Sequence, residues 1–392
     1  MNKDTIQEDA VNLSNKHKAL ILEWGTNLGK SRAFIKIHES LKAEKVLVVV
    51  AERLHINNWK TEYVKYNSKL LNGVTFVCYQ SLSKYVNEKF DLICLDEVHW
   101  LTPNRIKFLK LIKFTNFVGL SATLSYKTRD LLYSFLPTYY VDTISLSKAI
   151  DENLVPAPRF YLHKLNITKL TQKHSFVIKR GHGTLHKEIA YSQYKSIALN
   201  SNFKHLKLTV HSTVAQHLEY LDNTIDYYKK AIAMDPSSTR IAIYLNRLGL
   251  ERKKLLGVAK TEYVKSFLCN FNKKYICFCT NIEQANYLSS ETAIHSKNNT
   301  NDQVLSDFNN DKIDNIFAVK MLQEGINLSG IEASVIVQLD STTRSFIQKT
   351  GRALRSKDTP EIHIFYFEGT SDERYLNNAV KGVNEDLITY IE

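Results

Sequence analysis

The stretch Phe90-Asp91-Leu92-Ile93-Cys94-Leu95-Asp96-Glu97-Val98-His99 is a short apolar run that ends in two adjacent carboxylates. Short apolar runs of this kind are typical of strands that are buried on both faces of a parallel sheet. Such a strand delivers both carboxylates at its carboxyl end, where Asp96 can hold Mg²⁺ and Glu97 can orient an attacking water. The stretch therefore predicts an α/β fold and one half of a magnesium-dependent hydrolytic site.

The other half of that site is predicted upstream, in Trp24-Gly25-Thr26-Asn27-Leu28-Gly29-Lys30-Ser31. This loop follows an apolar run and precedes the helical stretch 32–41, so backbone N–H groups and a helix amino terminus would face phosphate oxygens. We expect Lys30 to reach the β- and γ-phosphates and the Ser31 hydroxyl to ligate Mg²⁺. Trp24 stands where the general phosphate-loop pattern has its first glycine. Together the two stretches predict a site for ATP and Mg²⁺.

Apolar runs alternate with amphipathic stretches in two series, which favours two parallel sheets with helices on both faces. The first series of expected strands is 19–23, 45–51, 74–78, 92–96 and 116–120, and the second is 275–279, 293–295, 315–319, 335–339 and 363–367. We predict an α/β protein with a first domain at 1–150, a linker and accessory segment at 151–265, and a second domain at 266–392.

The accessory segment begins near Val155-Pro156-Ala157-Pro158, because paired prolines resist both helix and central strand. It is expected to be mainly helical, with helices at 206–230 and 241–256. Residues 160–265 hold 18 Lys+Arg against 7 Asp+Glu, a balance of +11 in a chain whose net charge is +12. Localised positive charge favours a polyanion such as nucleic acid. The candidate contacts are Lys179, Arg180, Lys187, Lys204 and Lys207, and the alternative is a structural insert that stabilises the domain linkage.

The composition indicates packed cores, since 44% of the 392 residues are hydrophobic. The five cysteines are scattered without a CxxC pair, which argues against a zinc site or a disulfide framework. The amino terminus does not resemble a signal peptide, and the longest apolar run, 46–51, is far too short to span a membrane. We therefore expect a soluble, cytoplasmic protein.

Two further stretches bear on catalysis. Gly119-Leu120-Ser121-Ala122-Thr123 ends the fifth expected strand with small hydroxyl residues that can hydrogen-bond the carboxylates. Gln348-Lys349-Thr350-Gly351-Arg352-Ala353-Leu354-Arg355 places two arginines three residues apart, on one face of a helix. An arginine beside a γ-phosphate stabilises transition-state charge, whereas the alternative is a solvated basic helix.

The ordered set of these motifs, with Gln323-Glu324-Gly325-Ile326-Asn327 between them, resembles superfamily 2 helicases and translocases. Within that group the chain looks closest to DEAH-like DNA helicases, including phage-type branch-migration enzymes. The resemblance covers roughly residues 5–150 and 250–375. Thr26 falls on the threonine of the family's AxTGxGK[ST] loop, and Asn27 replaces a glycine. The resemblance implies two RecA-like domains with ATP in the cleft between them.

The resemblance also implies a role for each matching position. Gln7 would read adenine, and the remaining nucleotide contacts would come from Thr26, Asn27, Leu28, Gly29, Lys30, Ser31, Gly325 and Asn327. Asp96 and Ser31 would hold the metal, and the catalytic set would be Lys30, Asp96, Glu97, Gln348, Arg352 and Arg355. Coupling between nucleotide and nucleic acid would involve His99, Ser121, Ala122 and Thr123. The nucleic-acid backbone would be gripped by Arg53, Asn57, Asn58, Tyr79, Gln80, Ser81, Thr280 and Lys320.

The predicted function is that of an ATP-dependent helicase or translocase that acts on DNA and works as a monomer. An RNA helicase of the same architecture is one alternative, because backbone grips work on both nucleic acids. The other is a nucleic-acid-binding motor subunit without unwinding activity of its own. A phage origin is compatible with the resemblance and would place the protein in the host cytoplasm.

Overall fold

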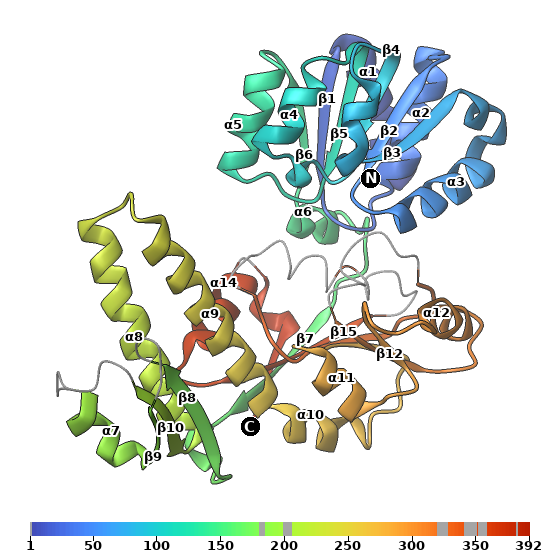
Figure 1. Cartoon of the computed structure of the whole chain (residues 1–392). Helices are drawn as coiled ribbons and strands as arrows, with labels where there is room; N and C mark the ends of the chain where they lie inside the picture. Colours follow the sequence, from blue (N-terminus) through green and yellow to red (C-terminus); the bar gives the residue numbers. More distant parts are fainter. Residues whose placement is uncertain are drawn as a thin grey trace.

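The computed structural model describes residues 2–179, 185–198, 206–319, 328–340, 351, 359–381 and 383–392. They form two sheet-based domains, the first above the second in Figure 1, with the amino terminus in the first and the carboxyl terminus in the second. A pair of long helices and a small sheet extend from the second domain. The chain thus has the two parallel-sheet domains that the alternating pattern predicts.

The first domain is built on a six-stranded parallel sheet in the order β3-β2-β4-β5-β1-β6. All five expected strands are present, and β6 adds an edge strand next to β1. The strands are β1 (Ala19–Trp24), β2 (Val46–Val50), β3 (Val74–Cys78), β4 (Lys89–Leu95), β5 (Lys113–Ser121) and β6 (Tyr140–Ile144).

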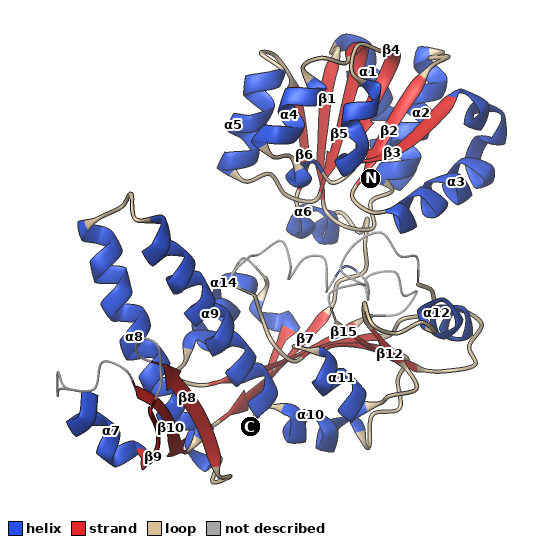
Figure 2. Ribbon diagram, in the orientation of Figure 1, coloured by secondary structure: helices blue, strands red, loops and turns tan. Residues whose placement is uncertain are grey.

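Helices cover both faces of this sheet, so that its strands form the central layer in Figure 2. Side chains of α1 (Lys3–Lys16), α2 (Lys30–Leu41), α3 (Arg53–Asn67) and α6 (Leu146–Asp151) share one apolar core with the sheet. Side chains of α4 (Pro103–Leu109) and α5 (Tyr126–Phe135) share the core on the opposite face. Two short 3₁₀ helices, η2 (Tyr79–Tyr85) and η3 (Val98–Trp100), follow β3 and β4, and η1 (Ser68–Gly73) precedes β3. Burial on both faces explains why the strand sequences are continuously apolar.

The second domain has a seven-stranded parallel sheet in the order β12-β13-β11-β14-β15-β7-β16. Its strands are β7 (Arg159–Leu165), β11 (Tyr275–Phe278), β12 (Ala293–Ile294), β13 (Asn315–Ala318), β14 (Ala333–Ile336), β15 (Glu361–Phe367) and β16 (Ile388–Ile391). Helices α12 (Asn301–Asn309) and α14 (Ser371–Ala379) pack on one face, and α10 (Thr261–Leu268) and α11 (Ile282–Leu288) on the other. A 3₁₀ turn, η5 (Glu385–Leu387), precedes β16.

The segment between the two series differs from the expected helical insert. β7 pairs along its whole length with β15, so residues 159–165 lie in the second domain's sheet. The expected helix at 206–230 is wrong in its first part, because Leu206–Ser212 is strand β10, paired with β8 (His174–Lys179) and β9 (Leu185–Ala190). Helices α7 (Tyr191–Ala198), α8 (Val214–Met234) and α9 (Thr239–Ala259) and the turn η4 (Ile167–Lys169) complete it.

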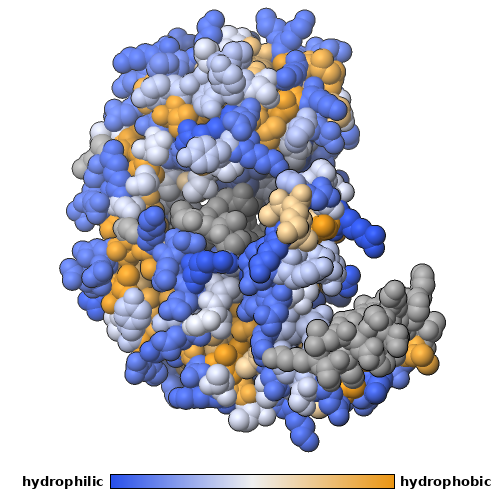
Figure 3. All heavy atoms as spheres, turned by 90° about the vertical axis from the view of Figure 1, so that its left-hand side faces the viewer, coloured by the Kyte–Doolittle hydropathy of each residue, from blue (hydrophilic) through white to orange (hydrophobic). Residues whose placement is uncertain are grey.

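Helices α8 and α9 pack against each other as a hairpin that projects from the second domain (Figure 1). Leu221 and Ile225 of α8 meet Leu248 of α9 in their shared core. The positive charge lies mostly before this hairpin, since residues 160–213 hold nine Lys+Arg against one Asp+Glu. Figure 3 shows the side of the molecule that is on the left in Figure 1, where the surface is hollowed between the two domains.

Among the described residues, no helix has the length and apolarity needed to cross a membrane.

Candidate nucleotide and nucleic-acid site

The loop between β1 and α2 has the backbone shape of a phosphate-binding loop. Gly29, the N-cap residue of α2, is in the left-handed conformation with a φ of +78° and has no side chain with which to cap the first turn of that helix. Asn27, which replaces a family glycine, also adopts a left-handed φ of +65°. Asparagine tolerates this conformation better than most residues, so the replacement preserves the loop's path. The ammonium of Lys30 donates to the carbonyls of Trp24 and Gly25, at 3.0 and 3.2 Å.

Trp24, at the position of the missing glycine, anchors the start of this loop. Its side chain is fully buried, and its indole N–H donates to Asp142 Oδ2 of β6 at 2.7 Å. The backbone N–H of Gly25 donates to the carbonyl of Ile144 at 2.8 Å. Both bonds tie the loop to the edge strand, and this tie explains why a large residue is accommodated there.

Gln7 of α1, which the resemblance implies to be the adenine-reading residue, lies against the loop. A Cβ on Gly29 would approach Gln7 Nε2 to 2.5 Å, so the glycine is required both by its φ and by this close contact. The Gln7 side chain is 2% exposed, and its Oε1 is buried without a hydrogen-bond partner in the described structure. A buried amide oxygen of this kind is suited to accept a hydrogen bond from a ligand.

The carboxylate pair, Asp96 and Glu97, lies at the carboxyl end of β4. Glu97 is held in the left-handed region at a φ of +52°, a strained conformation for a residue with a side chain. Its Oε2 lies 3.3 Å from His99 Nδ1. Burial raises the pKa of Asp96 to about 6, and the adjacent Glu97 adds to the rise. Lys30 and Asp96 follow strands of the same parallel sheet at its carboxyl edge, and the charge of Lys30 lowers the pKa of Asp96.

Two residues that sequence patterns did not assign to the metal site contact Asp96 directly. Trp59 of α3 donates its indole N–H to Asp96 Oδ2 at 2.8 Å. Tyr79 of η2 donates its hydroxyl to the backbone carbonyl of Asp96 at 2.9 Å. Neither contact has a signal in the sequence, because the partners are far apart along the chain and meet only where three strands end at one edge.

The small residues after β5 also lie at this edge. Ser121 is buried, and its hydroxyl donates to the carbonyl of Thr123 at 2.8 Å. The next N–H, that of Leu124, donates to Glu23 Oε1 at 2.8 Å, and Glu23 also pairs with Arg129 of α5 at 2.7 Å. Glu23 precedes the phosphate-binding loop by one residue. It therefore joins that loop to the Ser121–Thr123 segment, a role that the sequence did not suggest.

The second domain reaches the phosphate-binding loop at Gly351. A Cβ built on Gly351 would collide with the side chain of Thr26, so the backbone at Gly351 packs closely against Thr26 across the domains. Thr26 Oγ1 is buried and makes no hydrogen bond among the described residues. The other predicted catalytic and nucleotide-contacting positions of the second domain lie outside the described residues: Gly325, Asn327, Gln348, Arg352 and Arg355. Lys320, a predicted nucleic-acid contact, also lies outside them.

The predicted nucleic-acid contacts divide into exposed and buried groups. Arg53, Asn57 and Gln80 are exposed, and Asn58 and Ser81 are half-buried. Asn58 has a buried Nδ2 without a hydrogen-bond partner in the described structure.

The structure corrects the prediction for Tyr79 and restricts the one for Thr280. The Tyr79 side chain is 1% exposed and its hydroxyl is bonded to Asp96, so it cannot touch a strand on the surface. Thr280 packs against Gly257, and its Oγ1 is buried without a partner in the described structure. Its backbone N–H donates to Gln284 Oε1 at 2.7 Å.

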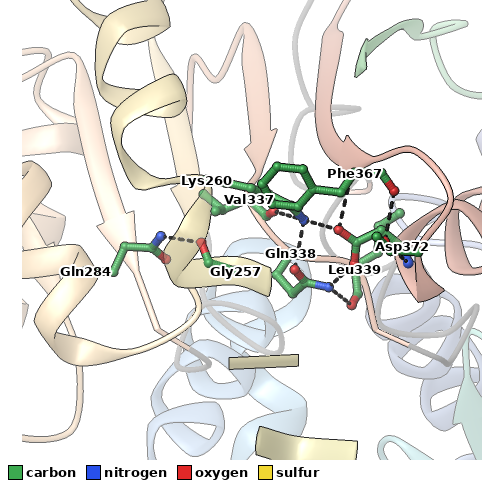
Figure 4. Close-up of polar contacts among 9 residues, drawn as sticks. Gly257, Lys260, Gln284, Val337, Gln338, Leu339, Phe367 and Asp372 are labelled. Atoms are coloured by element: carbon green, nitrogen blue, oxygen red, sulfur yellow. Dashed lines mark hydrogen bonds and ion pairs between the residues drawn. The ribbon is translucent and has the colours of Figure 1, made fainter. Parts of the chain in front are cut away.

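A buried polar network attaches α9 and α10 to the rest of the second domain (Figure 4). Lys260, between these helices, is fully buried and pairs with Asp372 of α14 at 2.6 Å. Its ammonium also donates to the carbonyl of Val337 at 3.0 Å and to Gln338 Oε1 at 2.8 Å. Gln338 in turn donates to Asp372 Oδ1 at 2.7 Å. The three side chains satisfy one another, as a buried ion pair requires.

The residues present at the first domain's edge fit ATP and Mg²⁺. The amino terminus of α2 with its glycine N-cap, the left-handed Gly29 and the Lys30 ammonium match the needs of a phosphate chain. The orphaned Gln7 Oε1 and Thr26 Oγ1 offer polar atoms beside it. Ser31 and Asp96 provide the hydroxyl and carboxylate oxygens that Mg²⁺ prefers.

Comparison with known proteins agrees with this geometry. The model of the helicase conserved C-terminal domain family matches residues 259–357. The DNA 3'-5' translocase XPB2 of Sulfurisphaera tokodaii is 23% identical over 389 residues, which cover 94% of this chain and 82% of that protein.

Two solved structures share the fold across nearly the whole chain. The Pyrococcus furiosus Hef helicase domain superposes with a TM-score of 0.53 at 15% identity, covering 96% of this chain and 97% of that one. Saccharomyces cerevisiae Dbp5 bound to RNA and ADP BeF3 superposes with a TM-score of 0.59 at 13% identity, covering 98% and 89%. These two structures confirm the fold of two RecA-like domains. The family model and the translocase relative support the superfamily 2 resemblance, whereas the DEAH-like, phage-type branch stays a prediction.

Proposed function

We propose that this protein is an ATP-dependent helicase or translocase that moves along DNA. The observation that carries the proposal is that Lys30, in the loop after β1, and Asp96, at the end of β4, both lie at the carboxyl edge of one parallel sheet. Ligands of parallel α/β sheets bind at the carboxyl ends of the strands. A phosphate loop and a carboxylate pair at that edge suit the hydrolysis of a nucleoside triphosphate.

Each side chain of the first domain has a distinct task in this proposal. Lys30 would pair with the β- and γ-phosphates, and Ser31 and Asp96 would hold the metal. Bound Mg²⁺ supplies charge neutralisation at the phosphate oxygens. Glu97 orients the attacking water and accepts its proton, with His99 beside it. Ser121 and Thr123, through Glu23, pass the state of the loop to the neighbouring surface.

The second domain completes the site in the proposal. The close contact of Gly351 with Thr26 supports a position for Arg352 and Arg355 beside the γ-phosphate, with Gln348, Gly325 and Asn327 near them. Binding of ATP would close the cleft and hydrolysis would reopen it. Backbone grips on the two domains would then advance alternately along one strand.

DNA is the proposed track because the curated relative is a DNA translocase. The 3'-to-5' direction is proposed on the same basis. On the first domain the track would pass Arg53, Asn57 and Gln80, which are exposed, and on the second domain Lys320. Monomeric action and a cytoplasmic location remain predictions.

The outer stripe of α9 is a further candidate for contact with the strand. Its residues Arg240, Ile243, Arg247, Leu250 and Lys254 are exposed and spaced by three or four, opposite the face that packs on α8. Ile243 is 70% exposed and Leu250 is 67% exposed. Basic and aliphatic side chains that alternate along one stripe can contact phosphates and the apolar faces of sugar and base together.

Charge reversal tests this stripe against a matched control. A triple variant, Arg240→Glu with Arg247→Glu and Lys254→Glu, should weaken binding of forked DNA and flatten its salt dependence by about one unit of slope per lost phosphate contact. The control triple reverses Lys107, Lys110 and Lys127, which are exposed on α4 and next to it and on α5. Equal effects of the two triples on binding and slope would contradict a specific role for α9.

Steady-state ATP hydrolysis tests the function itself. The purified protein should hydrolyse ATP faster with single-stranded or forked DNA than alone, and Glu97→Gln should abolish turnover but keep nucleotide binding. Stimulation by RNA only would move the assignment to an RNA helicase. Binding without stimulation by either polymer would indicate a motor subunit that requires a partner. A Glu97→Gln variant with wild-type turnover would contradict the proposed mechanism.

A further inference from the structure

We propose that Trp59 is a positioning residue that couples nucleic-acid binding on α3 to the metal-holding carboxylate of Asp96. The inference rests on the proposed function and extends it, because it names how an occupied strand path would reach the hydrolytic site. Its starting point is the hydrogen bond from Trp59 Nε1 to Asp96 Oδ2, at 2.8 Å.

Trp59 lies where three parts of the first domain meet. Its side chain is 3% exposed and belongs to the core shared by α2, α3 and the sheet. The ring stands edge-on to Phe34 of α2, with centroids 5.6 Å apart, and tilted to Tyr63 one turn along α3, at 6.3 Å. α2 is the helix that begins at the phosphate-binding loop. A movement of α3 therefore changes contacts with both halves of the ATP site.

The opposite side of α3 faces solvent at the same level. Asn57 is exposed, and two residues along a helix correspond to a rotation of about 200°. Asn57 therefore points outward where Trp59 points inward, and Arg53, four residues earlier, shares the outward side. A strand held by these two residues would pull on the backbone that carries the indole.

The second predicted grip repeats this arrangement. In η2, Gln80 is exposed and the preceding Tyr79 is buried with its hydroxyl on the backbone carbonyl of Asp96, at 2.9 Å. Each of the two surface segments thus carries an exposed residue and, one or two positions away, a buried residue that hydrogen-bonds Asp96. One contact fixes the carboxylate and the other fixes the peptide that carries it.

The hydrogen bond to the side chain has a defined chemical effect. A carboxylate that accepts an N–H at one oxygen is held in one rotamer, which leaves the other oxygen oriented for the metal. Partners that orient a metal ligand in this way typically affect metal affinity or activity by about 10–100-fold when they are removed. Lys30, His55 and Glu97 are the other charged or titratable groups that act on this carboxylate.

Trp59→Phe separates the hydrogen bond from the packing, because phenylalanine keeps an aromatic ring against Phe34 and Tyr63 but has no donor. The matched control is Tyr63→Phe, on the same helix and equally buried, which removes a hydroxyl bonded to His38 Nδ1 at 3.0 Å. ATP hydrolysis is measured against Mg²⁺ concentration, with and without saturating oligo(dT), and oligo(dT) affinity is measured separately.

We expect Trp59→Phe to raise the Mg²⁺ concentration for half-maximal rate by about 10-fold or more and to lose most of the stimulation by oligo(dT). Affinity for oligo(dT) and thermal stability should stay close to those of Tyr63→Phe, which should keep wild-type stimulation. Tyr79→Phe provides a second variant and should also reduce stimulation.

Two results would overturn the coupling while leaving the proposed function intact. One is wild-type Mg²⁺ dependence and stimulation in Trp59→Phe. The other is a loss of oligo(dT) affinity in proportion to the loss of rate, which would mean that the residue only supports the shape of α3. A wild-type protein that binds no nucleic acid would overturn the proposed function and, with it, the coupling.

Discussion

The ionisation of Asp96 should limit the rate of ATP hydrolysis at low pH. Burial and the neighbouring Glu97 raise the pKa of this carboxyl to about 6, and only its ionised form can hold Mg²⁺. At a fixed, sub-saturating concentration of free Mg²⁺, where the metal does not displace the proton, the rate should therefore rise as the pH passes through about 6 and level off above it. A pH–rate profile measures this limb. A rate that stayed constant down to pH ~5, well below that pKa, would show that Asp96 is not the group that binds the metal.

The same carboxylate should weaken the fold at neutral pH. The folded-state pKa lies above the ordinary value of 3.8, so the folded protein binds this proton more tightly than the unfolded chain does. Stability from this group is present below pH ~4 and is lost as the pH rises to about 6. Asp96→Asn should therefore raise the melting temperature at pH 8 and have little effect at pH 4. A lower melting temperature at pH 8 would contradict this reading of the burial.

The sequence predicts the residues of the hydrolytic site better than it predicts what orients them. Lys30, Asp96 and Glu97 have fixed places relative to a strand end, so local patterns reveal them. Trp59 and Tyr79 reach Asp96 through tertiary packing, and their spacing from it carries no signal. The resemblance therefore implies a nucleic-acid contact at Tyr79, whose side chain is buried.

At the level of elements, the contact between Gly351 and the phosphate-binding loop leaves no room for a side chain. A Cβ on Gly351 would collide with the side-chain atoms of Thr26, including its Cβ. Gly351→Ala should therefore push the second domain away from the loop and slow ATP hydrolysis, with little effect on the melting temperature. Turnover and differential scanning calorimetry measure the two effects.

A matched control for Gly351 is Gly249 of α9, where an added Cβ meets nothing within 4 Å. Gly249→Ala should keep wild-type turnover and slightly raise stability, since alanine favours a helix over glycine by about 1 kcal/mol. Full activity of Gly351→Ala would mean that the contact with Thr26 is not maintained during turnover.

The errors in predicting elements have a common physical origin. Leu206, Leu208 and Val210 alternate with polar residues, which is the period of a strand, but the stretch runs directly into the helical pattern of α8. β7 was placed with the accessory segment because pairing with β15, about 200 residues later, is invisible to local patterns. Strand order and long-range pairing are properties of the folded sheet, so the sequence predicts the two sheets but not where the chain crosses between them.

Over the whole molecule, the helical hairpin is joined to the second domain at several points near the end of β14. Lys260 pairs with Asp372, Lys253 contacts Asp340, and Arg252 lies 3.4 Å from the hydroxyl of Tyr375. Asp340 is the last described residue before the segment that leads to Gly351. The hairpin is therefore expected to move with the second domain when the cleft opens and closes, and not as an independent arm.

Lys260 is the centre of this attachment and provides its sharpest test. Lys260→Met should lower the free energy of unfolding by about 3–5 kcal/mol, because it leaves the carboxylate of Asp372 buried without its charged partner. Lys265→Met, an exposed position on α10, should change it by no more than about 0.5 kcal/mol. The double variant Lys260→Met with Asp372→Leu should recover much of the loss, since it removes both charges. Urea denaturation measures all three. If Lys260→Met were no less stable than Lys265→Met, the ion pair of Lys260 and Asp372 would not hold the hairpin to the domain. If the double variant were no more stable than Lys260→Met, the loss would come from packing around the lysine side chain and not from an unpaired Asp372 carboxylate.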